Sequence, residues 1–191
     1  MAHDGRRPDP RIERTRTAVT TTAAELLLAG GVRAVTIEAV VARSGVARST
    51  IYRHWPTRSD VVEAAFAHLL PPATPPPAKG SLAARLRAVM SPRVTEMNGA
   101  RYVPLVSSLL GEAARDPELA GLREQFVRTQ QAPLVAVLTD AVTAGELPPL
   151  DVDEATSTLL GPLLFERVIL GREIDPEFAE RTIDAFLARH A

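Results

Sequence analysis

The chain has 191 residues, of which 46% are hydrophobic and 24% are charged, and it carries no cysteine and a formal net charge of −1. These values fit a soluble globular protein of one or two domains, and the lack of cysteine excludes disulfides, thiolate catalysis and cysteine metal sites. The apolar run at residues 159–170 is too short and too charged to span a membrane, and residues 1–10 lack the apolar core of a signal peptide, so we expect a cytoplasmic protein without a membrane partner.

Charge is unevenly distributed along the chain. Residues 1–60 hold ten arginines and six acidic residues, a balance of +4, which leaves −5 for the remainder. A basic first part and an acidic second part indicate that only the first part meets a phosphate backbone.

The first predicted element follows a polar tail, residues 1–10, which we expect to be disordered. Arg6, Arg7 and Arg11 are placed to reach a phosphate backbone or a minor groove, although a solvated tail explains them equally well. From residue 11 to 29 the apolar spacing predicts a helix, which Gly30-Gly31 ends.

The central pattern is residues 36–55, TIEAVVARSGVARSTIYRHW. Thr36 suits an N-cap, and Gly45 suits the left-handed residue that ends a helix. A second short helix from about Ala47 turns Ile51 and Trp55 inward and leaves a face of hydroxyl and basic side chains outside. Two short helices around a tight turn are typical of a helix-turn-helix.

These residues resemble the N-terminal DNA-binding domain of TetR-family transcriptional regulators, from about Arg11 to Leu70. Two positions depart from the usual pattern: Trp55 stands where a Phe is common, and Arg58 stands where a Lys is common. Aromatic bulk and positive charge are kept at both. Plain helical packing with a solvated polar face is the alternative interpretation of the isolated stretch.

Arg48 is our first candidate for a base contact, because its guanidinium can bond guanine through two donors, and Ala47 is placed for a thymine methyl. The resemblance implies phosphate contacts for Thr36, Thr50, Tyr52, His54 and Arg58. The predicted DNA-binding residues are Thr36, Ala47, Arg48, Ser49, Thr50, Tyr52, Arg53, His54 and Arg58.

After Pro56, Thr57 is a suitable N-cap for a fourth helix to about Leu70. Residues 71–80 contain five prolines and predict an extended linker. The predicted organisation is therefore a tail at 1–10, a helix-turn-helix domain at 11–70, a linker at 71–80, and an effector-binding and dimerisation domain at 81–191.

The remainder shows helix after helix and no strand pattern, so we predict an all-α fold of about nine helices. Pro133 lies inside a long helical stretch, residues 117–144, and is expected to kink or break it.

The last two helices carry more apolar positions than one neighbour covers, and the resemblance implies a homodimer interface there. A monomer core is the alternative. The predicted interface residues are Leu160, Leu163, Leu164, Val168, Phe178, Ile183 and Phe186.

The middle helices are expected to form a pocket for a small-molecule effector, although apolar helical residues are more often core. The candidates are Met90, Met97, Tyr102, Leu105, Leu109, Phe126, Gln130 and Leu134.

No catalytic motif, cofactor-binding motif or metal-ligand spacing appears, so the chain is predicted not to be an enzyme and to need no cofactor or metal. We predict a DNA-binding transcriptional regulator that acts as a repressor. It binds a palindromic operator as a homodimer, and a small-molecule effector releases it from the operator. The alternative is a helical protein–protein adaptor, which leaves the arginines and hydroxyls of the recognition helix unexplained. The sequence does not identify the effector, the operator or the regulated genes.

Overall fold

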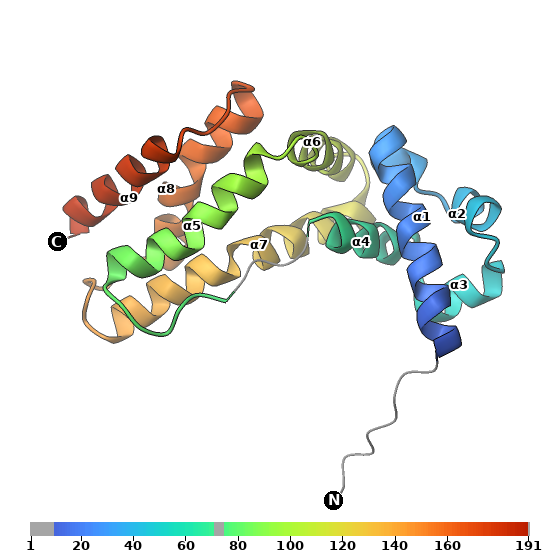
Figure 1. The fold of residues 1–191 in the computed structure, drawn as a ribbon, viewed down its shortest axis with the longest axis horizontal. Coiled ribbons are helices and arrows are strands. Elements are labelled where there is room, and N and C mark those ends of the chain that lie inside the picture. Colours follow the sequence, from blue (N-terminus) through green and yellow to red (C-terminus); the bar gives the residue numbers. More distant parts are fainter. Residues whose placement is uncertain (1–9, 71–74, 191) are drawn as a thin grey trace, which may run out of the picture. The chain divides into compact units, whose positions relative to one another are not determined.

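The computed structural model describes residues 10–70 and 75–190. Within these ranges it contains nine α-helices, one π-helical turn and no strand, which confirms the predicted all-α class (Figure 1). The first helix begins at Pro10, so the expected disordered tail, with Arg6 and Arg7, lies outside the described residues. In the described ranges no helix combines the length and the apolar character needed to cross a membrane.

Four helices make up the N-terminal part of the fold: α1 (Pro10–Ala34), α2 (Ile37–Ser44), α3 (Arg48–His54) and α4 (Arg58–Leu69). The α1 helix packs against α4 and α2, and α2 packs against α3. Their shared core includes Val19 and Leu27 of α1, Val40 of α2, Ile51 of α3 and Val62 of α4. The recognition elements are therefore held on a packed apolar base.

The end of α1 contains the break that the two glycines predict. Gly30 and Gly31 leave helical geometry, and Gly31 has φ 67° and ψ −168°, a conformation that is essentially restricted to glycine. A short helical turn then continues to Ala34 before Thr36 begins the next helix.

The later helices are α5 (Leu82–Asn98), α6 (Tyr102–Ala113), α7 (Pro117–Thr143), α8 (Val152–Leu164), the π-helical turn η1 (Phe165–Ile169) and α9 (Pro176–His190). In Figure 1, α5, α8 and α9 lie side by side, and α5 and α8 both contact α9. Leu86, Leu159 and Ile183 are buried in this part of the fold.

The chain forms two compact units whose boundary differs from the predicted one. One unit is Met1–Pro71 with Ser108–Leu122, and the other is Pro72–Ser107 with Arg123–Ala191. The end of α6 and the start of α7 fall within the predicted domain at 81–191, but they belong to the unit that holds the helix-turn-helix. We call Met1–Pro71 with Ser108–Leu122 the DNA-binding unit, after the role predicted for its helix-turn-helix, and the other the C-terminal unit.

Of the expected kink or break at Pro133, the break was wrong, because α7 is one helix from Pro117 to Thr143. A proline removes one backbone donor, but the flanking residues stay helical where buried side chains on both sides hold them. Gln130 and Leu134 are such residues. In the predicted linker, residues 75–80 are not helical, and residues 71–74 lie outside the described residues.

Candidate nucleic-acid interface

The start of the helix-turn-helix is fixed by one side-chain cap. The Thr36 hydroxyl accepts a hydrogen bond from the Ala39 backbone N–H at 3.1 Å, which satisfies one of the free donors at the start of α2. Gly45 ends α2 with φ 69°, and its N–H donates to the Val41 carbonyl. The turn between α2 and α3 therefore follows the local chemistry that the sequence predicts.

The recognition helix, α3, is anchored by two apolar side chains. Ile51 is fully buried and Trp55, which follows the helix, is 7% exposed. These side chains lie four residues apart, so the opposite side of α3 faces outward. Ala47, Arg48, Ser49, Tyr52 and Arg53 are exposed.

Three other predicted contact residues are half-buried: Thr36, Thr50 and His54. The His54 ring packs edge-on against Trp55, with the ring centroids 5.8 Å apart. These residues lie at the margin of the exposed face, where a phosphate backbone passes when a helix enters the major groove. Their DNA contacts remain predictions.

Arg48 is held by two neighbours that the sequence analysis did not pair with it. Its Nη1 lies 2.9 Å from a carboxylate oxygen of Glu38, and its Nη2 donates to the Tyr52 hydroxyl at 3.3 Å. The hydrogen bond to Tyr52 is the largest cause that raises the pKa of Arg48, followed by the charges of Tyr52 and Glu38. All three side chains are exposed, so the guanidinium is accessible from solvent.

Arg58 makes contacts within the protein that the sequence did not predict. Its Nε and Nη2 donate to the carbonyls of Val35 and Val32, at 2.8 and 2.7 Å. Its Nη1 lies 3.6 Å from Asp116. The guanidinium therefore closes the end of α1, and a phosphate contact would have to share it with these partners.

The segment Ser108–Leu122 contacts the same end of α1. The Val32 N–H donates to the Ser108 hydroxyl at 2.8 Å, and Arg33 pairs with Glu112 at 2.7 Å. With Arg58–Asp116, these make three polar links, which explains why this segment groups with the helix-turn-helix. They join residues far apart in the chain, so no local sequence pattern signals them.

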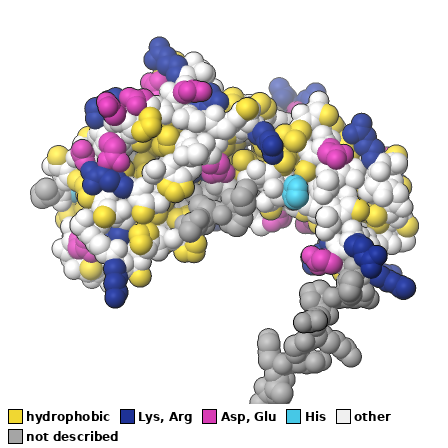
Figure 2. Space-filling model, viewed as in Figure 1, with side chains coloured by type: hydrophobic (Ala, Val, Ile, Leu, Met, Phe, Trp, Pro, Cys, Tyr) yellow, Lys and Arg dark blue, Asp and Glu magenta, His cyan; other side chains and the backbone are white. Residues whose placement is uncertain are grey.

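Figure 2 shows how charge appears on one face of the molecule. Dark blue Lys and Arg side chains are spread over the visible face of both units, and magenta acidic side chains lie beside several of them. One such acidic residue is Glu38, whose negative charge partly offsets the positive charge of Arg48 on the recognition helix.

Most of the predicted effector residues are buried. Met90, Met97, Tyr102, Leu105, Leu109 and Leu134 are at most 1% exposed, and Gln130 is 6% exposed. Phe126 is half-buried. Leu109 belongs to the DNA-binding unit, whereas the other seven residues belong to the C-terminal unit.

The C-terminal unit also brings together a polar cluster that sequence reasoning found only in part. Arg93 of α5 donates to Gln130 of α7, to the Tyr102 hydroxyl at 3.1 Å and to Glu96 at 2.6 Å. Burial is the largest cause that raises the pKa of Tyr102, although the positive charge of Arg93 opposes it. The available signal for this cluster was the position of Arg93 among the apolar residues Met90, Val94 and Met97 of one helix.

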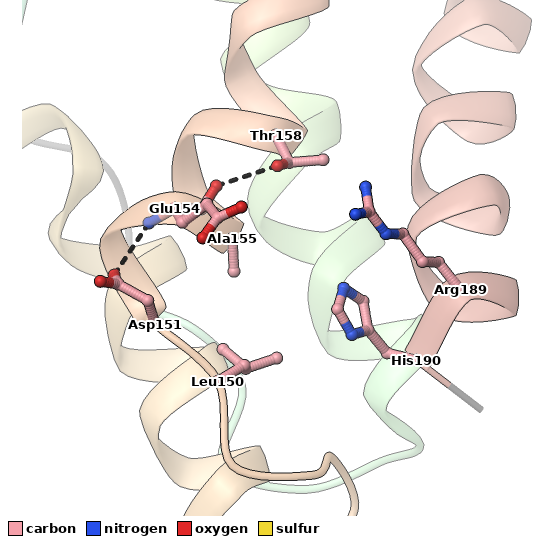
Figure 3. A pocket seen from close by; sticks show the side chains of 7 residues that line it. All are labelled: Leu150, Asp151, Glu154, Ala155, Thr158, Arg189 and His190. Carbon is pink, nitrogen blue, oxygen red and sulfur yellow. Dashed lines mark hydrogen bonds between the residues drawn. The ribbon is translucent and has the colours of Figure 1, made fainter.

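Small cavities lie elsewhere in the C-terminal unit. One, of about 80 Å³, lies between the start of α8 and the end of α9 (Figure 3). Asp151 and Glu154 face it from one helix, and Arg189 and His190 from the other. A second, also about 80 Å³, is lined by Met90 of α5 and Ile183 of α9. In the described ranges no group of three or more His, Cys, Asp or Glu is placed to hold a metal ion.

The predicted dimer residues divide into core and surface. Leu160, Leu163, Ile183 and Phe186 are at most 6% exposed within one protomer, so they serve its own core. Leu164, Val168 and Phe178 are half-buried. Helical spacing alone did not separate the inward face from the outward one, because both faces of α8 carry apolar residues.

An apolar groove lies on the outward side of α8 and α9. It has a volume of about 420 Å³ and is lined by Thr158, Pro162, Phe178, Arg181, Thr182, Ala185, Phe186 and Arg189. Phe165 and Ile169 of η1 are 53% and 68% exposed.

Two family models match most of the chain. The model described as "Bacterial regulatory proteins, tetR family" matches residues 19–65, and the one described as "Tetracyclin repressor-like, C-terminal domain" matches residues 76–186. The first covers the helix-turn-helix and the second covers α5 to most of α9.

Individual relatives agree with these matches. The chain is 26% identical over 175 residues to the uncharacterized HTH-type transcriptional regulator YdeS of Bacillus subtilis, covering 91% of this chain and 88% of that protein. It is 29% identical over 161 residues to the uncharacterized HTH-type regulator Rv1556 of Mycobacterium tuberculosis, covering 83% and 79%. The crystal structure of the TetR family transcription regulator SCO0332 is similar in fold, with a TM-score of 0.67, 24% identity and coverage of 93% and 99%.

Proposed function

Because the chain belongs to the TetR family of bacterial regulatory proteins, we propose that it is a repressor that binds a palindromic operator as a homodimer and leaves it when a small molecule binds. Members of this family are DNA-binding transcriptional regulators and not enzymes. The repressor role, the dimer, the effector and the cytoplasmic location are parts of the proposal.

The observation that carries the proposal is the outward face of α3. Ile51 and Trp55 fix this helix to the core, Ser49 and Arg53 are exposed on the opposite side, and Arg48 is exposed at the start of the helix. An α-helix fits the major groove of B-form DNA, where each base pair presents a distinct set of donors and acceptors. A preorganised helix that presents guanidinium and hydroxyl groups can therefore read bases directly.

The short recognition helix and an apolar surface of the C-terminal unit both support a homodimer. One α3 helix covers only a few base pairs, and a two-fold dimer places two such helices about 34 Å apart on a palindrome. The groove on α8 and α9 with the exposed Phe165 and Ile169 is an apolar surface that a second copy would cover. We assign the interface to this outward surface, with Phe178 and Phe186 as the residues shared with the predicted set.

Support for an effector comes from the interior of the C-terminal unit. Buried apolar residues of α5, α6 and α7 flank a buried polar cluster on the same helices, which is the composition of small-molecule sites. Release requires the effector to bind the state that cannot bind DNA more tightly than the state that can.

The test is selection from random DNA duplexes with the purified full chain at two salt concentrations. Enrichment of a palindrome, with affinity that falls as salt rises, supports a dimer that reads sequence. Arg48→Ala should then lose about 1–3 kcal/mol of binding free energy at one operator position only, because base contacts specify and phosphate contacts do not.

A folded protein that enriches no sequence at either salt concentration would contradict the proposal. That result would favour the adaptor alternative, in which the exposed face of α3 binds a protein.

A further inference from the structure

The buried polar cluster of the C-terminal unit contains two atoms without partners. Arg93 is 8% exposed, Gln130 is 6% and Tyr102 is 1%. Among the described residues, Arg93 Nε and Glu96 Oε1 are buried and make no hydrogen bond. A buried donor or acceptor without a partner costs about 1–3 kcal/mol, and more when the group is charged.

The two atoms have complementary chemistry. Arg93 Nε carries a hydrogen to donate, and Glu96 Oε1 can only accept. Their two side chains already form an ion pair through other atoms, because Arg93 Nη1 lies 2.6 Å from Glu96 Oε2. A single group that accepts from Nε and donates to Oε1 would satisfy both atoms.

This arrangement differs from the other unpaired buried atoms of the described residues. Arg85 Nε and Thr156 Oγ1 also lack partners, but at each of these places only one atom is unpaired. Arg85 pairs with Glu146, whose side chain is 40% exposed, compared with 22% for Glu96. Across residues 10–70 and 75–190, only the Arg93–Glu96 pair offers an unpaired donor and an unpaired acceptor on neighbouring side chains.

Apolar side chains lie one helical turn from each member of the cluster. Met90 and Met97 are three and four residues from Arg93 on α5, Leu105 is three from Tyr102 on α6, and Leu134 is four from Gln130 on α7. Residues at these spacings share a helix face, and all four of these apolar residues are at most 1% exposed. A ligand at the cluster would therefore meet hydrocarbon on the same faces.

The opposite charges of Arg93 and Glu96 restrict which polar group the ligand can carry. Arg93 and Glu96 cancel each other, so a carboxylate would meet Glu96 and an ammonium would meet Arg93, each in a medium where an uncompensated charge is costly. A hydroxyl or a carboxamide both donates and accepts without adding charge.

We infer that the effector is a predominantly apolar molecule with a neutral hydroxyl or carboxamide group, which accepts from Arg93 Nε and donates to Glu96 Oε1 while Tyr102 and Gln130 hold Arg93 in place. This inference rests on the proposed effector function and names the chemical class that the effector belongs to.

Four matched probes test the inference in the absence of DNA: 4-butylphenol, 4-butylbenzamide, butylbenzene and 4-butylbenzoate. Calorimetric titration of the full chain should show the phenol or the benzamide binding at least about tenfold more tightly than butylbenzene and butylbenzoate. A site that hydrogen-bonds a hydroxyl rejects the analogue that lacks it, because the site's own polar atoms are left unpaired.

Glu96→Gln gives a second, independent readout. It removes the negative charge beside Arg93, so the preference for the phenol or the benzamide over butylbenzoate should fall by about tenfold or more. Glu177→Gln is the matched control, because Glu177 also pairs with an arginine of its own helix but is exposed. It should leave all four affinities unchanged.

Equal binding of the four probes, or binding of none at about 1 mM, would overturn the inference and leave water as the partner of the two atoms. The wild-type comparison stands even if Glu96→Gln does not fold. Failure here would leave DNA selection unaffected, so it is distinguishable from failure of the proposed function.

Discussion

At the scale of single residues, two arginines of the DNA-binding unit have separate tasks. Arg48 is exposed and held by Glu38 and Tyr52, which are themselves on the surface. Arg58 is turned inward onto two backbone carbonyls. An exposed ion pair contributes little to stability, whereas two hydrogen bonds from a charged donor to part-buried carbonyls contribute much more. We therefore expect Arg48 to matter for DNA and Arg58 to matter first for folding.

Glu38→Gln should raise the affinity for a random duplex about two- to tenfold at low salt, because it removes a negative charge next to the recognition helix and frees a partner of Arg48. Fluorescence anisotropy with a labelled duplex at two salt concentrations measures this. The gain should shrink at the higher salt concentration. An affinity equal to that of wild type at low salt would mean that Glu38 does not oppose DNA binding.

Arg58→Ala should lower the free energy of unfolding by about 2–3 kcal/mol, because it leaves the Val35 carbonyl without its donor and takes one of two donors from the Val32 carbonyl. Urea unfolding can be followed by the fluorescence of Trp55, the single tryptophan, which is buried in the same unit. Unchanged stability combined with weaker DNA binding would instead support the phosphate contact that the sequence resemblance implies.

At the scale of elements, local sequence determines where the helices begin and end, whereas contacts between helices depend on residues far apart in the chain. Thr36, Gly45 and Thr57 were predictable as caps, and the structure shows their side chains or backbone in that role. The end of α1 was predictable from its two glycines. The reason Gly31 must be glycine lies partly in Ser108, far along the chain.

Gly31→Ala should destabilise the protein more than Gly45→Ala. Both residues have positive φ, which costs a residue with a Cβ about 1–2 kcal/mol. At Gly45 a Cβ would meet no atom within 4 Å, whereas at Gly31 it would collide with the Ser108 hydroxyl. Thermal and urea unfolding of the two variants compares them. Equal losses would show that Ser108 moves aside without cost.

The sequence predicted the helices and the outward face of α3 because both depend on patterns within about twenty residues. It did not predict that Glu38 pairs with Arg48, that Arg58 turns inward or that Glu96 pairs with Arg93. These depend on packing between helices or on rotamers. The expected interface residues Leu163 and Ile183 lie in the protomer core, because an apolar stripe does not say which neighbour covers it.

At the scale of the whole molecule, the proposed homodimer depends on the outward surface of α8 and α9. Ala185 lines the groove and is exposed, whereas its neighbour Phe186 is 3% exposed and also serves the protomer core. A charge at Phe186 would therefore disrupt folding as well as assembly. Ala185 is the better position at which to test association.

Ala185→Glu should produce monomers, because two copies would bury like charges in an apolar surface. Light scattering coupled to gel filtration measures the mass. Ser157→Glu is the control, since Ser157 is exposed on α8 but is not among the residues that line the groove. If both variants remain dimers, the interface lies on another surface.

The segment Ser108–Leu122 has a consequence for engineering hybrid regulators. Joining the first seventy residues of this chain to another effector domain would remove Ser108, Glu112 and Asp116, the partners of Val32, Arg33 and Arg58. A hybrid cut at the proline-rich linker would thus begin with an incomplete DNA-binding unit. A transplant that keeps these three side chains together with the first four helices respects the unit that the fold defines.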